Sequence, residues 1–210
     1  MKDINTLIKD ATDYYEEKLK KYGPTFQSVD WNSKESQELR FDQLIKVIDK
    51  SDDNFSILDY GCGYGALYLY LKSKFPKFYY YGYDASDAMI EKAISLNSNT
   101  QCNWFSDPIN LIKTDYVVAS GLFNVKQSYH HDEWNEYAID TLLSLNTLAV
   151  KGFAFNLLTK YSEKVRMKNN LFYADPLFFF DYCKKNFSRN IALLHDYSLY
   201  EFTILVRKGN

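Results

Sequence analysis

The chain has 210 residues, of which 46% are hydrophobic and 25% are charged, so it has the composition and length of a globular protein with one core. A net charge of -2 excludes a whole-protein field that would gather nucleic acid or an anionic membrane. The opening segment MKDINTLIKDATDYYEEKLKK carries charges every few positions, so it lacks the apolar stretch of a signal peptide or a membrane span. We therefore expect a cytoplasmic protein without membrane insertion.

The cysteines argue against a metal centre. Cys62, Cys102 and Cys183 are odd in number, widely spaced and without a CxxC pair. A disulfide framework or a zinc site needs paired or clustered cysteines. We expect these three side chains to fill apolar space, and we predict no metal site.

The first fifty residues are predicted to be mainly helical. A helix precedes the joint KKYGPTF at residues 20–26. A second helix is predicted after Ser33, which is a possible N-cap, because Phe41, Leu44, Ile45 and Ile48 have the spacing of one helix face. We expect residues 1–50 to form an N-terminal helical lid or cap and residues 51–210 to form a single-core domain.

Strands then alternate with helices. Strands are predicted at 55–60, 78–84, 103–105, 115–120 and 152–159, and helices at 66–74, 86–97, 132–149 and 176–187. Ser86 is the predicted N-cap of the second of these helices. The last two apolar runs, 190–195 and 200–208, are separated by too few residues for a parallel crossover and should form an antiparallel hairpin. The pattern predicts an α/β three-layer sandwich with a mostly parallel seven-stranded sheet that ends in this hairpin.

The first strand–loop–helix unit, SILDYGCGYGALYLYL at 56–71, predicts a ligand site. Gly61, Gly63 and Gly65 permit a tight turn on which a ligand can lie directly against the backbone. The same residues with Ala66 also satisfy the GxGxxA pattern of dinucleotide-binding proteins. The glycines alone leave the nature of the ligand open.

Two acidic residues narrow the choice of ligand. Asp59 lies two positions before the first glycine, where a carboxylate would repel a pyrophosphate and attract a cationic or zwitterionic ligand. Asp84 ends the second strand, nineteen positions after Gly65, where an acidic side chain can accept hydrogen bonds from ribose hydroxyls. Together they predict a nucleoside with a positively charged part.

The segments ILDYGCGYG (57–65) and YYGYDASDAMIEKA (80–93) resemble the first two motifs of class I S-adenosylmethionine-dependent methyltransferases, and the closing hairpin is similar to the antiparallel last strand of that fold. The resemblance implies a site for S-adenosylmethionine (product S-adenosylhomocysteine). It implies that the glycine loop holds the methionine part, that Asp84 and the adjacent Ala85 meet the ribose, and that Ser106 and Asp107 meet the adenine.

The resemblance implies three further residues that lie near the cofactor. Ser120, at the end of the fourth strand, matches the position that borders the sulfonium and the acceptor. Trp31 and Arg40 match positions that face the cofactor in small methyltransferases of bacterial surface-polysaccharide clusters. A guanidinium at residue 40 is suited to a bidentate pair with the α-carboxylate of the cofactor.

The acceptor is expected to be a small anionic molecule. Lys160, Lys164, Arg166 and Lys168 form the richest basic stretch, and the resemblance extends to methyltransferases of capsule clusters, including those that methylate a phosphoramidate ornament. This implies O-methylation of a phosphorylated, phosphoramidate or nucleotide-linked precursor. The acidic composition argues against a nucleic-acid acceptor.

His195, His130 and Tyr22 are the candidate catalytic residues, because each is expected near the rim of the site and can take part in proton transfer. The sequence does not predict the oligomeric state. Two alternatives remain open: an NAD-dependent oxidoreductase, and a non-catalytic domain that binds S-adenosylmethionine as a sensor or partner subunit.

Overall fold

The strands form one sheet. In the computed structural model, which describes residues 4–98 and 102–209, the strand order is β3-β2-β1-β4-β5-β8-β7, and a short β6 pairs with β5. The strands are β1 (Phe55–Tyr60), β2 (Phe78–Tyr83), β3 (Cys102–Phe105), β4 (Thr114–Ala119), β5 (Ala149–Thr159), β6 (Tyr173–Ala174), β7 (Asn190–Leu194) and β8 (Glu201–Arg207). The predicted seven-stranded sheet is therefore confirmed, with β6 as an addition.

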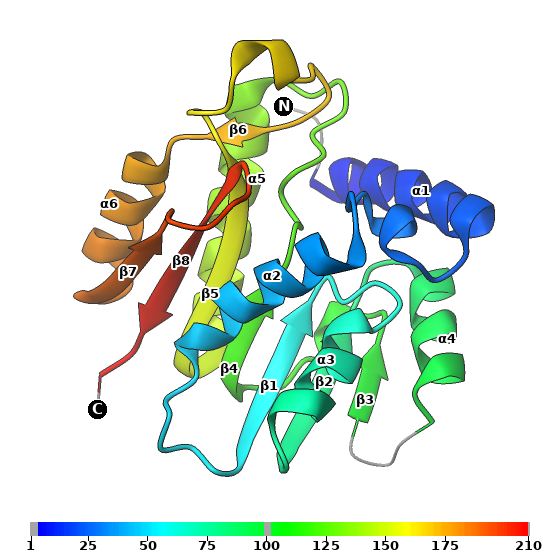
Figure 1. Ribbon diagram of the computed structural model, residues 1–210, viewed down its shortest axis with the longest axis vertical. Helices are drawn as coiled ribbons and strands as arrows, with labels where there is room; N and C mark the ends of the chain where they lie inside the picture. Colours follow the sequence, from blue (N-terminus) through cyan, green and yellow to red (C-terminus); the bar gives the residue numbers. More distant parts are fainter. Residues whose placement is uncertain (1–3, 99–101, 210) are drawn as a thin grey trace.

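Helices cover both faces of this sheet (Figure 1). They are α1 (Ile4–Tyr22), α2 (Lys34–Leu44), α3 (Ala66–Lys74), α4 (Asp87–Leu96), α5 (His131–Leu148) and α6 (Pro176–Asn186). Buried side chains of α2 and α3 pack with one face of the sheet, and those of α5 and α6 pack with the other. This is the expected three-layer arrangement. None of the helices in the described part of the chain is long and apolar enough to cross a membrane.

The closing hairpin lies where the sequence predicts it. β1 pairs in parallel with β2 and β4, whereas β8 is antiparallel to both β5 and β7. β8 is thus inserted between β5 and the edge strand β7. The amino end of β8 consequently lies beside the carboxyl end of β5, since Glu201 pairs with Leu158.

Serine side chains start two of the helices. Ser33 Oγ accepts a hydrogen bond from Ser36 N at 3.1 Å, and Ser86 Oγ accepts one from Met89 N at 3.1 Å. These bonds satisfy amide groups that have no partner within the first helical turn. Both caps are as the sequence predicts.

The predicted boundary at residue 50 does not separate a cap from the core. Phe41 (4% exposed) and Leu44 (0%) of α2 lie in the same buried cluster as residues of β1 and α3. Because this helix face is buried against the sheet, α2 belongs to one of the helical layers of the domain. The helix also ends earlier than the apolar spacing predicts, because Ile45–Val47 forms a 3₁₀ turn.

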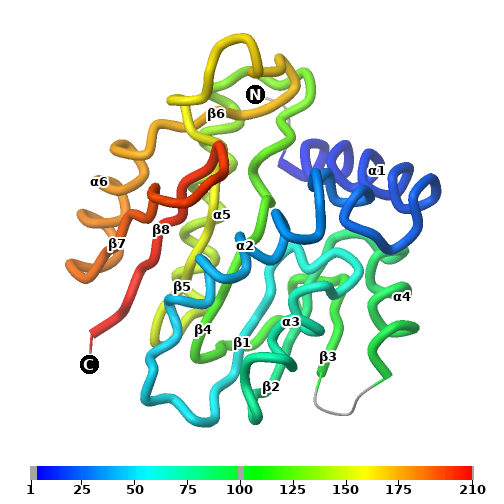
Figure 2. The backbone as a smooth tube through the Cα atoms, in the orientation of Figure 1, coloured from blue at the N-terminus to red at the C-terminus, as the bar shows by residue number. Residues whose placement is uncertain are grey.

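Helix α1 lies outside the layers, across the carboxyl end of the sheet and beside the segment that leads from β4 to α5 (Figure 2). Gln127 Nε2 donates to the Asp10 carbonyl at 2.8 Å, and Tyr129 Oη donates to Asp10 Oδ2 at 2.7 Å. On its other side, Glu16 accepts a hydrogen bond from Ser86 Oγ at 2.8 Å. These contacts hold α1 over the edge of the sheet where ligands bind in open α/β folds.

Candidate active site

The glycine loop joins β1 to α3 in a left-handed conformation. Gly61, Gly63 and Gly65 have φ values of +85°, +53° and +83°. A Cβ at Gly63 would lie 3.3 Å from Val29, so a side chain here would be strained and crowded. The amides of Gly61 and Cys62 donate to the Tyr83 carbonyl at 2.7 and 2.9 Å, which ties the loop to the end of β2.

Asp84 connects the loop to β2 from the side of the pocket. Its carboxylate accepts hydrogen bonds from Gly63 N at 2.8 Å and from Ser86 N at 3.0 Å. Burial raises the pKa of Asp84 despite these two bonds, and nearby Glu16 adds to the rise. A positive charge placed beside this carboxylate would therefore be stabilised.

A pocket of about 290 Å³ lies between the loop and α1. Its floor and one wall come from the ends of β1, β2 and β4, and its roof comes from α1. The lining comprises Ile4, Ile8, Ala11, Thr12, Tyr15, Val29, Trp31, Tyr60, Gly61, Gly63, Tyr83, Asp84, Ala85, Met89, Ser120, Gly121, Leu122, Tyr137, Asp140, Thr141 and Ser144.

The charge of this lining is negative. Asp84 and Asp140 are its charged side chains, and no lysine, arginine or histidine occurs among the described residues that line it. Burial raises the pKa of Tyr15, Tyr83 and Tyr137, so these phenols are protonated at neutral pH. Carboxylates and aromatic rings together favour a cationic ligand over a pyrophosphate.

Asp59 lies below the glycine loop and is not part of the lining. It is 2% exposed, and Tyr80 Oη donates to its Oδ2 at 2.7 Å. Burial raises its pKa to about 7, and the charge of Asp84 acts in the same direction. Its influence on a ligand is therefore electrostatic and passes through the loop.

The Ser120 hydroxyl is a candidate for contact with a ligand. The residue lines the pocket, and Ser120 Oγ is a buried atom to which no residue in the described part of the chain offers a hydrogen bond. A buried polar atom without a partner is unfavourable unless a ligand or water satisfies it. The neighbouring Gly121 has a φ of +70°, and its amide is bound to Asn156 Oδ1 at 2.8 Å.

The structure brings six of the predicted cofactor residues into this lining: Trp31, Gly61, Gly63, Asp84, Ala85 and Ser120. Gly65 lies outside it as the N-cap of α3, packed against Trp104. Ser106 and Asp107 are also outside, and Asp107 caps the 3₁₀ turn Pro108–Asn110 by accepting from Ile109 N at 2.9 Å. Arg40 is buried elsewhere, against Glu201.

The three catalytic candidates do not line the pocket. His195 follows β7, three strands from β4 in the sheet, a separation of about 14 Å. His130 is the exposed N-cap residue of α5, and Tyr22 ends α1 beneath Lys21. None of the three occurs among the described residues that line the cavity.

Sequence reasoning expected a lid from the first fifty residues but missed the contribution of α5, above all Tyr137. A signal for α1 exists, because Ile4, Ile8, Ala11 and Tyr15 share one helix face. That spacing predicts a buried face, although it does not predict what the face covers.

The donor set fits S-adenosylmethionine. The ligand has ribose hydroxyls suited to the Asp84 carboxylate, a positive sulfonium suited to an acidic, aromatic lining, and polar groups that can satisfy Ser120. The fit agrees with the comparisons to known proteins. Residues 57–138 match the family described as "Methyltransferase domain".

One relative covers most of the chain. A Mycobacterium tuberculosis protein named "Putative methyltransferase Rv1506c" is 45% identical over 159 residues, which make up 75% of this chain and 96% of that protein. Identity at this level over nearly the whole relative shows a common family.

Two solved structures share the fold. Magnesium protoporphyrin IX methyltransferase (ChlM) from Synechocystis PCC 6803 with bound S-adenosylhomocysteine has a TM-score of 0.67 and 18% identity, covering 96% of this chain and 99% of that chain. The N-methyltransferase NodS from Bradyrhizobium japonicum WM9, also with S-adenosylhomocysteine, has a TM-score of 0.64 and 13% identity, covering 95% and 98%. With its motifs, its fold and its relative in agreement, the chain belongs to the class I S-adenosylmethionine-dependent methyltransferases.

Proposed function

We propose that this enzyme transfers the methyl group of S-adenosylmethionine to a small acceptor that enters the pocket beneath α1. The observation that carries the proposal is the common cavity: the glycine loop, Asp84 and the Ser120–Gly121 turn all line a space that α1 roofs. When bound, the cofactor supplies an electrophilic methyl group on a sulfonium.

Each of these groups has a proposed role toward the cofactor. The Asp84 carboxylate accepts hydrogen bonds from the ribose, and the backbone of Gly61 and Gly63 lies against the methionine part. The Ser120 hydroxyl gains the partner that it lacks in the protein alone. Trp31 forms an apolar wall beside Gly121, which limits where the transferred methyl group can lie.

The protein promotes transfer mainly by alignment and by excluding water. Methyl transfer from a sulfonium is an in-line displacement, so fixing the reactants in line removes much of the entropic barrier. Ile4 and Ile8 of α1 supply apolar contacts at the roof. The hydrogen bonds of Asp10 and Glu16 support this roof from two sides.

The charge of the acceptor is the point at which the pocket and the sequence-based expectation differ. The basic residues predicted to hold an anion are outside the lining, and two of them have acidic partners: Lys160 with Asp175 at 2.6 Å and Arg166 with Glu163 at 3.6 Å. We therefore propose that the part of the acceptor inside the pocket is uncharged or cationic. A phosphate or phosphoramidate of a surface-polysaccharide precursor would remain outside.

A methyl-transfer assay with paired acceptors tests this proposal. Small amines, alcohols and sugars are each supplied with and without a phosphate, and product S-adenosylhomocysteine is quantified. We expect turnover with acceptors whose attacking atom is neutral, such as an alcohol oxygen or a deprotonated amine nitrogen, with Asp84→Ala as the inactive control. Labelling of only protein or nucleic acid would contradict the proposal. Tight S-adenosylhomocysteine binding without any turnover would favour the sensor alternative, and tight NAD binding alone would favour the oxidoreductase.

A further inference from the structure

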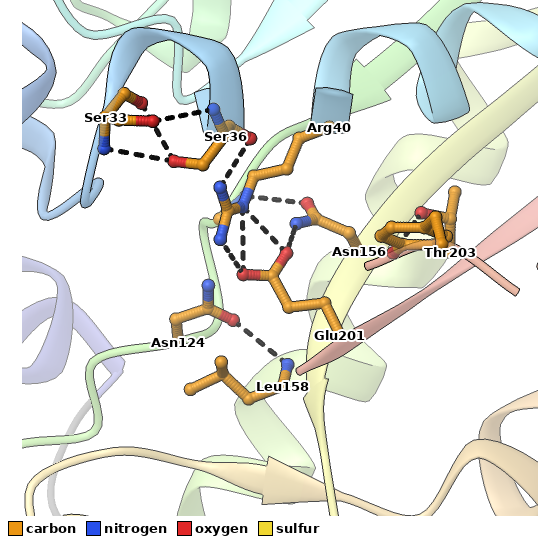
Figure 3. Close-up of polar contacts among 10 residues, drawn as sticks. Ser33, Ser36, Arg40, Asn124, Asn156, Leu158, Glu201 and Thr203 are labelled. Carbon is orange, nitrogen blue, oxygen red and sulfur yellow. Dashed lines mark hydrogen bonds and ion pairs between the residues drawn. The ribbon is translucent and has the colours of Figure 1, made fainter. Parts of the chain in front are cut away.

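A buried ion pair lies directly behind the pocket wall. Arg40 Nε is 2.9 Å from both carboxylate oxygens of Glu201, and Arg40 Nη2 is 2.5 Å from Glu201 Oε1. The exposed fractions of the two side chains are 6% and 1%. Arg40 Nη1 also donates to the Ser36 carbonyl at 2.6 Å, within the helix that carries both residues. The guanidinium is thus engaged on several sides (Figure 3).

From Glu201 the contacts continue to the lining. Asn156 Nδ2 donates to Glu201 Oε2, while Asn156 Oδ1 accepts from the Gly121 amide at 2.8 Å. A second bond fixes the same segment three residues later, because Asn124 Oδ1 accepts from Leu158 N at 3.3 Å. Figure 3 shows these contacts converging from α2, β5 and β8.

The other end of the network touches the lining through an indole ring. The Arg40 guanidinium lies over the Trp31 ring, 3.8 Å from its centroid. That ring packs so closely on Gly121 that a Cβ there would lie 2.3 Å from it. Trp31 and Gly121 line the pocket, whereas Arg40, Asn156 and Glu201 do not. The network therefore contacts the wall at two points without entering the cavity.

Stability alone does not explain such a pair. Removing two charges from water offsets much of their attraction, and apolar residues of similar size are often at least as stable. This network joins α2 to a strand 161 residues away and to the turn beside Ser120. Asn156 contacts Gly121 and Arg40 contacts Trp31, so the network fixes the positions of these two lining residues.

We infer that Arg40, Glu201 and Asn156 are positioning residues that hold the Trp31–Gly121 wall in place around the sulfur of the cofactor. In this arrangement Arg40 acts through Trp31 and Glu201, and its charge is neutralised by Glu201. The role differs from direct pairing with the α-carboxylate of the cofactor, which the resemblance implies for this residue.

Two ligands separate these roles: S-adenosylhomocysteine and 5′-methylthioadenosine, which retains the nucleoside and sulfur but has no carboxylate. Their affinities are measured by calorimetry for Arg40→Met and Glu201→Gln. We expect each variant to bind both ligands about tenfold more weakly, because the shared sulfur lies against the displaced wall. We also expect the Gly121 amide resonance to move in both ligand-free variants.

Two control variants guard against general loss of structure. Asp52→Asn breaks a different ion pair, with Lys151 at 3.0 Å, before the start of β1, and should leave both affinities unchanged. The double variant Arg40→Met/Glu201→Met removes both charges, so it should fold at least as well as either single variant while binding both ligands weakly.

Two results would overturn the inference. If Arg40→Met weakened only S-adenosylhomocysteine while Glu201→Gln left its affinity unchanged or increased it, Arg40 would be a direct carboxylate ligand. If all variants lost stability but bound both ligands normally, with the Gly121 resonance unmoved, the network would serve folding only.

Discussion

Asp59→Asn should remove a pH dependence of stability that the buried carboxyl imposes. Burial raises the pKa of Asp59 from 3.8 to about 7. Between these values the folded protein keeps a proton that the unfolded chain has released, so stability falls as the pH rises and levels off above pH 7. Each pKa unit corresponds to about 1.4 kcal/mol, which gives a total effect of about 4 kcal/mol. An asparagine can still accept the Tyr80 hydrogen bond but cannot ionise.

Urea unfolding of the native and variant proteins between pH 5 and pH 8 measures this effect. The free energy of unfolding of Asp59→Asn relative to the native protein should rise by about 3 kcal/mol over this interval, because most of the ionisation of Asp59 occurs within it. The exposed Asp53 supplies a control, since Asp53→Asn removes a carboxylate from the surface. A difference that stays constant from pH 5 to pH 8 would refute the reasoning.

Three further substitutions probe the lining by calorimetry with S-adenosylhomocysteine and by urea unfolding. Asp84→Ala should weaken binding by about 2 to 4 kcal/mol through loss of a buried carboxylate acceptor; unchanged affinity would contradict its assignment. Ser120→Ala should change stability by less than about 1 kcal/mol, since the hydroxyl has no protein partner, yet weaken binding by about 1 kcal/mol. Gly121→Ala should abolish tight binding, whereas Gly23→Ala, with a φ of +64° and no neighbour within 4 Å, should cost only about 1 kcal/mol of stability. If the two glycine variants had the same affinity for S-adenosylhomocysteine, the predicted clash at Gly121 would be excluded.

Features encoded in neighbouring residues could be predicted from the sequence. β1 occupies residues 55–60 as expected, because an uninterrupted apolar run followed by a glycine turn permits few other structures. The position of Asp84 at the edge of the sheet follows from the same alternation of strand and helix. The serine caps of α2 and α4 were predictable for the same reason, since a cap depends on contacts within one turn.

Features that depend on tertiary contacts were not predictable. The sequence identifies Arg40 as a free cation near the loop, but its partner Glu201 comes from the last strand, and only the folded sheet brings the two together. His195 correctly falls at the carboxyl edge, but the strand order puts it far from β4. Tyr137 lies on α5 and lines the pocket together with Tyr60 of β1 and Tyr83 of β2, which are far from it in the sequence. No local pattern contains that information.

The choice of ligand by the glycine loop depends on charge more than on the glycines. A loop with Gly61, Gly63 and Ala66 is compatible with dinucleotides, so its shape alone does not select the cofactor. Asp84 in the lining and Asp59 beneath the loop are both buried, and burial raises the pKa of each carboxyl group because a negative charge is less stable away from water. A sulfonium supplies a compensating positive charge, whereas a pyrophosphate would add further negative charge. The proposal for the acceptor rests on the same balance, because an anion placed inside the pocket would face carboxylates and no cation among the described lining residues.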